Sequence, residues 1–287
     1  MRVQSQCAVE RVSAIMLLVY GDESMDESSK RVCAAAAVAG TEEKWLELES
    51  AWIDRTGGIP FHANDCESDQ GLYRDIPHKE NLALYRDLTA MLARSGLIGF
   101  GSALDLVALK AHFSLMPDHW HYYRVWVDVV EFMKNIARDT DDVAEITFDN
   151  RAESEFNATL VYANLREENP EWKERLSSKL SFESSIINPR IQVGDLVARE
   201  VMKDLDNLIG PVKRPARGSW KALRETGRFL AYNYSTKWFR DLEKDLPNLA
   251  QQEGFVRDDY EAWLKERRRQ DNLTAYLEFY HWHKTQK

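Results

Sequence analysis

The sequence has few cysteines and no long apolar run. Its 287 residues include three cysteines, at positions 7, 33 and 66, without a CxxC pair. This odd, scattered set argues against a disulfide framework and a zinc ribbon and favours a reducing cytoplasmic location. No stretch approaches the roughly 20 apolar residues that a membrane-spanning helix needs. The apolar run at residues 15–20 is also too short for a secretory signal. We therefore expect a cytoplasmic protein without a membrane partner.

Positive charge is scarce over the whole chain. The formal net charge is −9, from 38 Lys and Arg against 47 Asp and Glu. This total argues against indiscriminate nucleic-acid binding, because surfaces that follow phosphates are usually basic. Residues 210–240 are an exception, since only Glu225 opposes the basic side chains there. A local excess of this kind says more about partners than the total charge does.

Two interpretations of this basic segment stay open. Its cations alternate with Trp220, Phe229, Tyr232 and Tyr234, a composition that could grip a phosphate backbone and stack on bases. Alternatively, the cations form a solvated face and the aromatic rings pack on the rest of the protein. On the first interpretation, the predicted nucleic-acid contacts are Lys213, Arg214, Arg217, Lys221, Arg224 and Arg228.

Short apolar runs alternate with amphipathic segments along the chain. The strand-like runs are residues 16–21, 32–38, 97–104, 144–149 and 179–183, and the helical segments are residues 41–54, 79–95, 118–137, 152–167 and 190–209. The first two strands, joined by a short polar loop, predict an antiparallel hairpin. Strands interleaved with helices predict an α/β protein with a mixed sheet flanked by helices.

The same pattern predicts three parts of the chain. Residues 1–15 read as an N-terminal extension, residues 16–210 as the α/β domain, and residues 211–287 as a helical C-terminal appendage without strands. A helical insertion separates the second and third strands. The segment at residues 61–65 within this insertion reads as a loop, and residues 169–170 read as a turn.

Three aspartates occupy places where chemistry is common. Asp22 and Asp149 each close a strand, and Asp195 lies early in a helix. Ligands gather at the carboxyl ends of strands in an α/β sheet. Carboxylates brought together repel one another unless a cation neutralises them, and Mg²⁺ or Mn²⁺ suits such oxygen ligands. Two ions of this kind could activate water and stabilise the leaving oxygen in phosphodiester hydrolysis.

Each candidate also has a plainer interpretation. An aspartate that closes a strand is often a turn former or a helix N-cap. Glu23 can join the cluster only if the strand ends beside it, because adjacent strand residues face opposite ways. His62 could be a metal ligand, a proton shuttle or a phosphate contact, or it could cap the following loop. Cys66 follows four residues after His62, but two ligands alone do not make a zinc site.

Four short motifs resemble an uncharacterised bacterial family catalogued as the domain of unknown function 3800. Residues 19–24 (V-Y-G-D-E-S) are similar to its opening Y-x-D-E-S motif, and residues 61–63 (F-H-A) to its F-H-A/G element. Residues 146–149 (I-T-F-D) resemble its strand ending in Asp. Residues 191–198 (I-Q-V-G-D-L-V-A) resemble its I-Q-x-A-D-x-x-A helix, except that Gly194 replaces the usual Ala.

The resemblance implies a ribonuclease H-like fold and a metal-dependent site of the nuclease type. Matching the motifs gives Asp22, Glu23, His62, Asp149 and Asp195 as candidate catalytic residues. The three aspartates are then the expected ligands of Mg²⁺ or Mn²⁺. A tight meander is expected between the second and third strands of a ribonuclease H sheet, so the helical insertion is a departure.

The first functional hypothesis is a divalent-metal-dependent nuclease, or a related phosphoryl-transfer hydrolase, acting on DNA or RNA. The alternatives are a non-catalytic module that binds nucleic acid or a protein partner in a larger bacterial system, and a hydrolase of a small phosphorylated molecule. The first hypothesis makes three structural predictions. The three aspartates converge on a common ion, residues 16–21 and 145–148 are neighbouring parallel strands inside the sheet, and the basic segment lies on the side of the aspartates.

Overall fold

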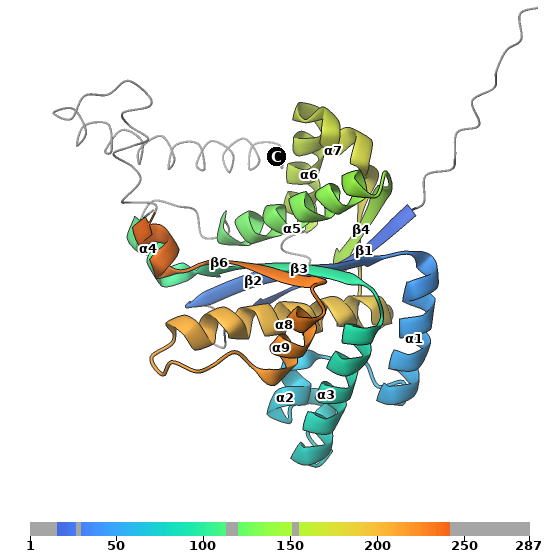
Figure 1. Cartoon of the computed structure of the whole chain (residues 1–287), viewed down its shortest axis with the longest axis vertical. Helices are drawn as coiled ribbons and strands as arrows, with labels where there is room; N and C mark the ends of the chain where they lie inside the picture. The colour runs from blue at the N-terminus through green and yellow to red at the C-terminus, as the bar shows by residue number, and fades with distance from the viewer. Residues whose placement is uncertain (1–15, 27–29, 113–119, 151–154, 242–287) are drawn as a thin grey trace, which may run out of the picture.

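A computed structural model describes residues 16–26, 30–112, 120–150 and 155–241. In this part of the chain, six strands form one mixed sheet in the order β5-β4-β1-β2-β3-β6, with helices on both faces (Figure 1). The predicted α/β class and the mixed sheet flanked by helices are confirmed. None of the helices within these ranges is both long and apolar enough to cross a membrane.

The centre of the sheet follows the predicted strands. β1 (Met16–Met25) and β2 (Val32–Gly40) form the antiparallel hairpin, and β3 (Ile98–Asp105) pairs antiparallel with β2. β4 (Val143–Asp149) runs parallel to β1 on its other side. The prediction that these two apolar runs are neighbouring parallel strands inside the sheet is therefore confirmed. β5 (Leu176–Glu183) is parallel to β4 and forms one edge.

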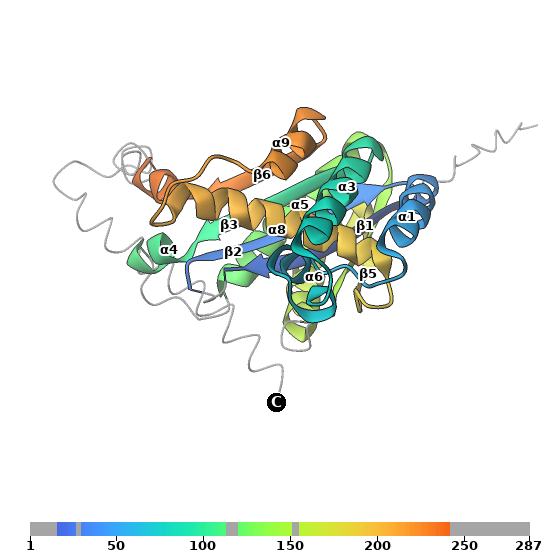
Figure 2. The same cartoon turned by 90° about the horizontal axis from the view of Figure 1, so that it is seen from below.

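Helices form a layer on each face (Figures 1 and 2). One face is covered by α5, α6 and α7, and the other by α8 with α1, α2, η1, α3 and α9 outside or beside it. The bounds are α1 (Glu42–Thr56), α2 (Ala63–Ser68), η1 (Gly71–Tyr73), α3 (His78–Arg94), α4 (Leu106–His112), α5 (Trp120–Asp139), α6 (Glu155–Glu168), α7 (Pro170–Arg175), α8 (Pro189–Ile209) and α9 (Gly218–Glu225).

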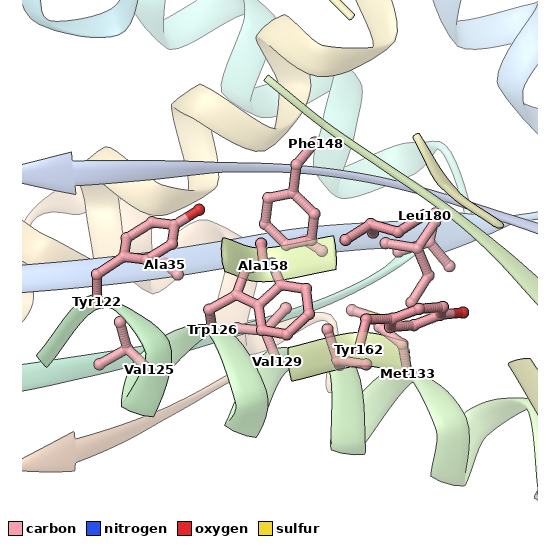
Figure 3. Packing of buried hydrophobic residues seen from close by; sticks show 14 of the residues in the cluster. Ala35, Tyr122, Val125, Trp126, Val129, Met133, Phe148, Ala158, Tyr162 and Leu180 are labelled. Carbon is pink, nitrogen blue, oxygen red and sulfur yellow. The ribbon is translucent and has the colours of Figure 1, made fainter. Parts of the chain in front are cut away.

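The α5 layer is held by a continuous apolar core. Trp126, Val129 and Met133 recur at helical spacing on one face of α5 and are fully buried. The Trp126 ring lies 5.9 Å from the ring of Phe148 on β4 and 6.4 Å from that of Tyr162 on α6 (Figure 3). The helix predicted at residues 118–137 is confirmed from Trp120 onward.

Three local predictions are wrong. β1 does not end at Asp22 but continues to Met25, because its pairing with β2 extends that far. The segment at residues 61–65 is not all loop, since α2 begins at Ala63. The turn predicted at residues 169–170 is the start of α7, where the Asn169 side chain accepts hydrogen bonds from the first backbone amides.

The predicted all-helical appendage is also wrong in its described part. After α9, β6 (Phe229–Tyr234) pairs with β3 and extends the sheet. Phe229 and Tyr234, at the two ends of β6, are buried, whereas Leu230 and Tyr232 are exposed at this edge of the sheet. The sequence of β6 therefore lacks the continuous run of buried apolar residues that marks a central strand. Residues 211–241 therefore continue the same fold. Residues 1–15 and 242–287 lie outside the described residues.

Candidate functional site

Asp22 and Asp149 lie side by side on the α8 face of the sheet. The parallel pairing of β1 with β4 ends at Gly21 and Phe148, and the two aspartates follow directly on strands about 4.8 Å apart. Phe148 belongs to the core on the α5 side, so the next residue faces α8. Ala36, paired with Asp22 across β2, belongs to the α8-side core, so Asp22 faces α8 as well.

Gly194 brings α8 into contact with β1 at this position. A Cβ atom on Gly194 would lie 3.0 Å from the Cα and carbonyl carbon of Gly21 and 3.2 Å from the backbone nitrogen of Asp22. A glycine therefore allows an approach that a larger residue would prevent. The next residue, Asp195, is carried to the sheet by the same contact.

The Phe61-His62-Ala63 element meets the cluster from a third direction. Phe61 is buried between Trp52 and Tyr85, with ring centroids 5.5 and 5.9 Å away. This anchor places the backbone amide of Ala63 where it donates to Asp195 Oδ2 at 2.6 Å. The segment therefore positions one of the candidate carboxylates.

His62 lies at the exposed rim. Its side chain is 55% exposed, and Nδ1 lies 3.2 Å from Asp65 Oδ2. It is the N-cap residue of α2, but its side chain makes no capping hydrogen bond, so the structural role considered from the sequence is not observed. Burial raises the pKa of the Asp195 carboxyl, and the interaction with His62 opposes this rise, so His62 lies within electrostatic reach of that residue.

Each aspartate has one oxygen held by a backbone amide. Asp22 Oδ1 accepts from the Glu23 amide at 2.7 Å, and Asp149 Oδ1 accepts from the Ser185 amide at 2.8 Å. Asp195 is held in the same way by Ala63. The second oxygen of each carboxylate accepts no hydrogen bond from the described residues, which leaves it available to a cation or to water.

The acidic groups of the cluster act on one another. Burial raises the pKa of Asp22 well above its ordinary value, and the charges of Glu23, Asp195 and Asp149 raise it further. Burial is also the main cause of the raised pKa of Asp195, with a smaller contribution from Asp149. His62, the Ala63 amide and Arg199 act in the opposite direction on Asp195. The three aspartates therefore lie within electrostatic reach of one another.

The predicted convergence on one common ion is not present in this conformation. Within the described ranges, no group of three or more His, Cys, Asp or Glu side chains is arranged to hold a metal ion. Each aspartate turns one oxygen to a backbone amide. The donors are nonetheless of the kind that Mg²⁺ prefers, since this ion often binds one or two carboxylates and completes its shell with water or substrate phosphate.

Glu23 does not share the face of the three aspartates. β1 continues past it, so the condition for its joining the cluster is not met. Its partner across β2, Ala35, belongs to the core on the α5 side. Glu23 therefore acts on Asp22 through its charge rather than as a fourth ligand on the α8 face.

Cys66 does not form a zinc pair with His62. Its buried thiol donates to the backbone oxygen of Asn81 at 3.3 Å, and burial raises its pKa to about 12. A thiol that stays protonated at neutral pH is a poor metal ligand.

An ionic network beside the cluster was missed in the sequence. Arg199, one helical turn after Asp195, contacts Glu67 at 3.0 Å. Glu67 also holds Arg217 at 2.7 Å, and Arg217 lies 3.2 Å from Glu200. The spacing of Asp195 and Arg199 could have suggested a common helix face, but nothing local connects Glu67 to α8.

This network corrects one predicted phosphate contact. Arg217 is engaged by Glu67 and Glu200, and its guanidinium also lies over the Tyr85 ring, 5.2 Å from the centroid. It is thus a structural cation, held between α2, α3 and α8. The other five predicted contacts have exposed side chains: Lys213, Arg214, Lys221, Arg224 and Arg228.

The aromatic residues of the basic segment pack mostly inside the protein. Trp220 and Phe229 are buried in the α8-side core, and Tyr234 is buried in the core on the other face. Only Tyr232 of the four is exposed, so the interpretation that all of them stack on bases is wrong. Because Trp220 anchors α9 on the α8 side, the cations of α9 lie on the same face of the sheet as the aspartates.

The sequence matches no protein-family profile, and no curated protein is significantly similar to it. The resemblance to the bacterial family therefore rests on the four motifs alone.

Proposed function

We propose that this protein is a divalent-metal-dependent phosphodiester hydrolase of the ribonuclease H-like kind, acting on nucleic acid. The observation that carries the proposal is the cluster of Asp22, Asp149 and Asp195 on two parallel strands and a helix, with the pKa of Asp22 raised by burial and by its acidic neighbours. A cation would relieve this repulsion. A cytoplasmic location belongs to the same proposal.

The arrangement of the strands is compatible with this fold. Three antiparallel strands, β3-β2-β1, are followed by β4 and β5 running parallel to β1. The helical insertion between β2 and β3 lengthens their connection without changing their pairing. It also supplies α2, whose first amide holds Asp195.

Each residue has a distinct role in the proposed reaction. Asp22, Asp149 and Asp195 would hold Mg²⁺ or Mn²⁺, which activates water and offsets charge on the phosphate when it is bound. The Ala63 amide fixes the orientation of Asp195. His62, exposed at the rim, can transfer a proton between solvent and the reacting oxygens. The exposed cations of α9 would hold flanking phosphates.

The exposed cations Lys213, Arg214, Lys221, Arg224 and Arg228 equally suit a second candidate, a non-catalytic nucleic-acid-binding module. Such a module would keep the fold and its exposed cations while lacking turnover. The two candidates make different predictions for the same assay.

The test is cleavage of labelled single- and double-stranded DNA and RNA with Mg²⁺ or Mn²⁺. We expect metal-dependent cleavage by the wild type and a loss of at least about a hundredfold in Asp22→Asn, because a metal ligand is removed. Asp204→Asn is the matched control, since Asp204 lies on α8 and holds only Asn233 among the described residues. Cleavage that persists in Asp22→Asn or without metal contradicts the proposal, and binding without cleavage supports the module.

A further inference from the structure

The loop between β5 and α8 exposes two adjacent isoleucines beside the aspartate cluster. Ile186 is 73% exposed and Ile187 is 83% exposed, the highest values among the large hydrophobic residues in the described part of the chain. Single exposed apolar residues are common, but a neighbouring pair at the rim of a polar site is a candidate contact surface.

Hydrogen bonds fix this loop to the site. The Ser185 amide donates to Asp149 Oδ1 at 2.8 Å, so the residue next to Ile186 touches a candidate metal ligand. The Ser185 carbonyl accepts from Gln192 Nε2 at 2.7 Å, and Gln192 is itself held by Trp52. The Ile187 amide donates to the carbonyl of Ser184 at 2.9 Å. The isoleucines are therefore held in place rather than carried on an untethered loop.

The chemistry of the loop indicates what it would contact. Its sequence, S-S-I-I-N at residues 184–188, carries no charge. Phosphates are recognised by cations and hydrogen-bond donors, whereas isoleucine side chains contact or wedge between the faces of bases. Arg190, the nearest cation along the chain, is occupied by Glu42 and Glu49 at 2.8 and 2.7 Å.

We propose that Ile186 and Ile187 contact the bases next to the phosphate bound at the aspartate cluster. This inference rests on the proposed function and deepens it. Bases stacked inside an undistorted duplex offer no face to such a pair. The expected substrate is therefore a single-stranded or locally unstacked nucleic acid.

The experiment is fluorescence anisotropy with the full-length protein and Ca²⁺ in place of the catalytic ion. The probes are a single-stranded DNA of about 12 nucleotides, within the usual range of site sizes, and an abasic strand of the same length. The variant is Ile186→Ser with Ile187→Ser. The matched control is Leu46→Ser with Ile53→Ser, which replaces two exposed apolar residues of α1.

We expect the loop variant to bind the base-containing strand about tenfold more weakly than the control does, because apolar burial is lost. Both variants should bind the abasic strand equally, since its phosphates are unchanged.

Equal affinity of the two variants for the base-containing strand overturns the inference but leaves the proposed function, which the Asp22→Asn cleavage assay tests separately. Equal affinity together with a loss of self-association in the loop variant also overturns it, in favour of a contact between copies of the chain. No binding of any probe by the wild type overturns the inference and weakens the proposed function with it.

Discussion

The charge on Asp22 is the most consequential feature at the scale of single residues. Its folded pKa is raised, first by burial and then by Glu23, Asp195 and Asp149. The folded protein therefore favours the protonated carboxyl. The stability that this preference contributes is fully present below the pKa that Asp22 has in the unfolded chain. It is lost as the pH rises through the pKa that Asp22 has in the folded protein. At a pH above the ordinary pKa of aspartate, the raised pKa therefore makes the folded protein less stable than it is at low pH.

The first prediction concerns Asp22→Asn in metal-free buffer. The amide keeps an oxygen for the Glu23 amide but removes the buried charge, so the variant should be more stable than the wild type at pH 7, by on the order of 1 kcal/mol. The difference in stability between the variant and the wild type should shrink as the pH is lowered toward the ordinary pKa of aspartate. Thermal unfolding at pH 7 and pH 5 measures this. A variant less stable than the wild type at pH 7 would show that the carboxylate is stabilised by a partner.

Gly194 carries the second prediction. A Cβ there meets the Gly21 backbone at 3.0 Å, which strains the contact between α8 and β1. Gly194→Ala should change the free energy of unfolding little, because a gain in helix propensity of about 1 kcal/mol offsets this strain. Gly194→Leu should destabilise the protein by roughly 1–3 kcal/mol through overpacking. Urea unfolding of both variants checks the prediction, and a harmless Gly194→Leu would mean that the helix is not held against β1.

At the scale of elements, α8 joins the site to the rest of the fold. It carries Asp195 on its second turn and, on the following turns, Arg199 and Glu200, which link it to α2 and to residues preceding α9. Tyr85 of α3 also donates to Glu200, at 2.6 Å. Movement of α8 would therefore disturb the carboxylates and the ionic network together.

The third prediction compares Arg217→Met with Arg224→Met. Removing Arg217 takes a cation from Glu67 and Glu200, which keep only Arg199 and the hydroxyls of Tyr85 and Ser219, so the variant should lose on the order of 2 kcal/mol of stability. Arg224 is exposed and its replacement should change stability by less than about 0.5 kcal/mol. Denaturant unfolding measures both. Equal effects would refute the structural role assigned to Arg217.

The elements that the sequence predicted best are those whose apolar residues follow a single clear pattern. The helix ending at Asp139 shows its buried face through Trp126 and Val129, and the apolar runs of β1 and β4 mark interior strands. β6 was missed because a half-exposed edge strand with flanking charges lacks that signal. Asp22 and Asp149 could be singled out because each lies at the end of an apolar run. Glu67 could not, because its partners Arg199 and Arg217 lie more than a hundred residues away.

At the scale of the whole molecule, a net charge of −9 coexists with exposed cations on the face that carries the aspartates. On the proposed function, long-range attraction to nucleic acid would therefore be weak, and binding would depend on local contacts. Lys221 and Arg224 on α9 are the exposed cations best placed to test this.

The fourth prediction is that Lys221→Glu with Arg224→Glu weakens binding to all sequences alike and flattens its salt dependence. Each lost phosphate contact should remove roughly 0.7–0.9 from the slope of log affinity against log salt concentration. Cleavage once bound should change less than in Asp22→Asn. Titrations at several salt concentrations provide the measurement. An unchanged slope would assign α9 to packing or to a protein partner.

The most direct test of the central claim is a crystal structure of the wild-type protein with Mn²⁺, located by its anomalous scattering. Binding of the ion should draw the free oxygens of Asp22, Asp149 and Asp195 toward it, with coordination distances of about 2.0–2.6 Å. We predict an anomalous peak among these three carboxylates in the wild type and none in Asp22→Asn. A saturating Mn²⁺ concentration that leaves this position empty in the wild type would contradict the account.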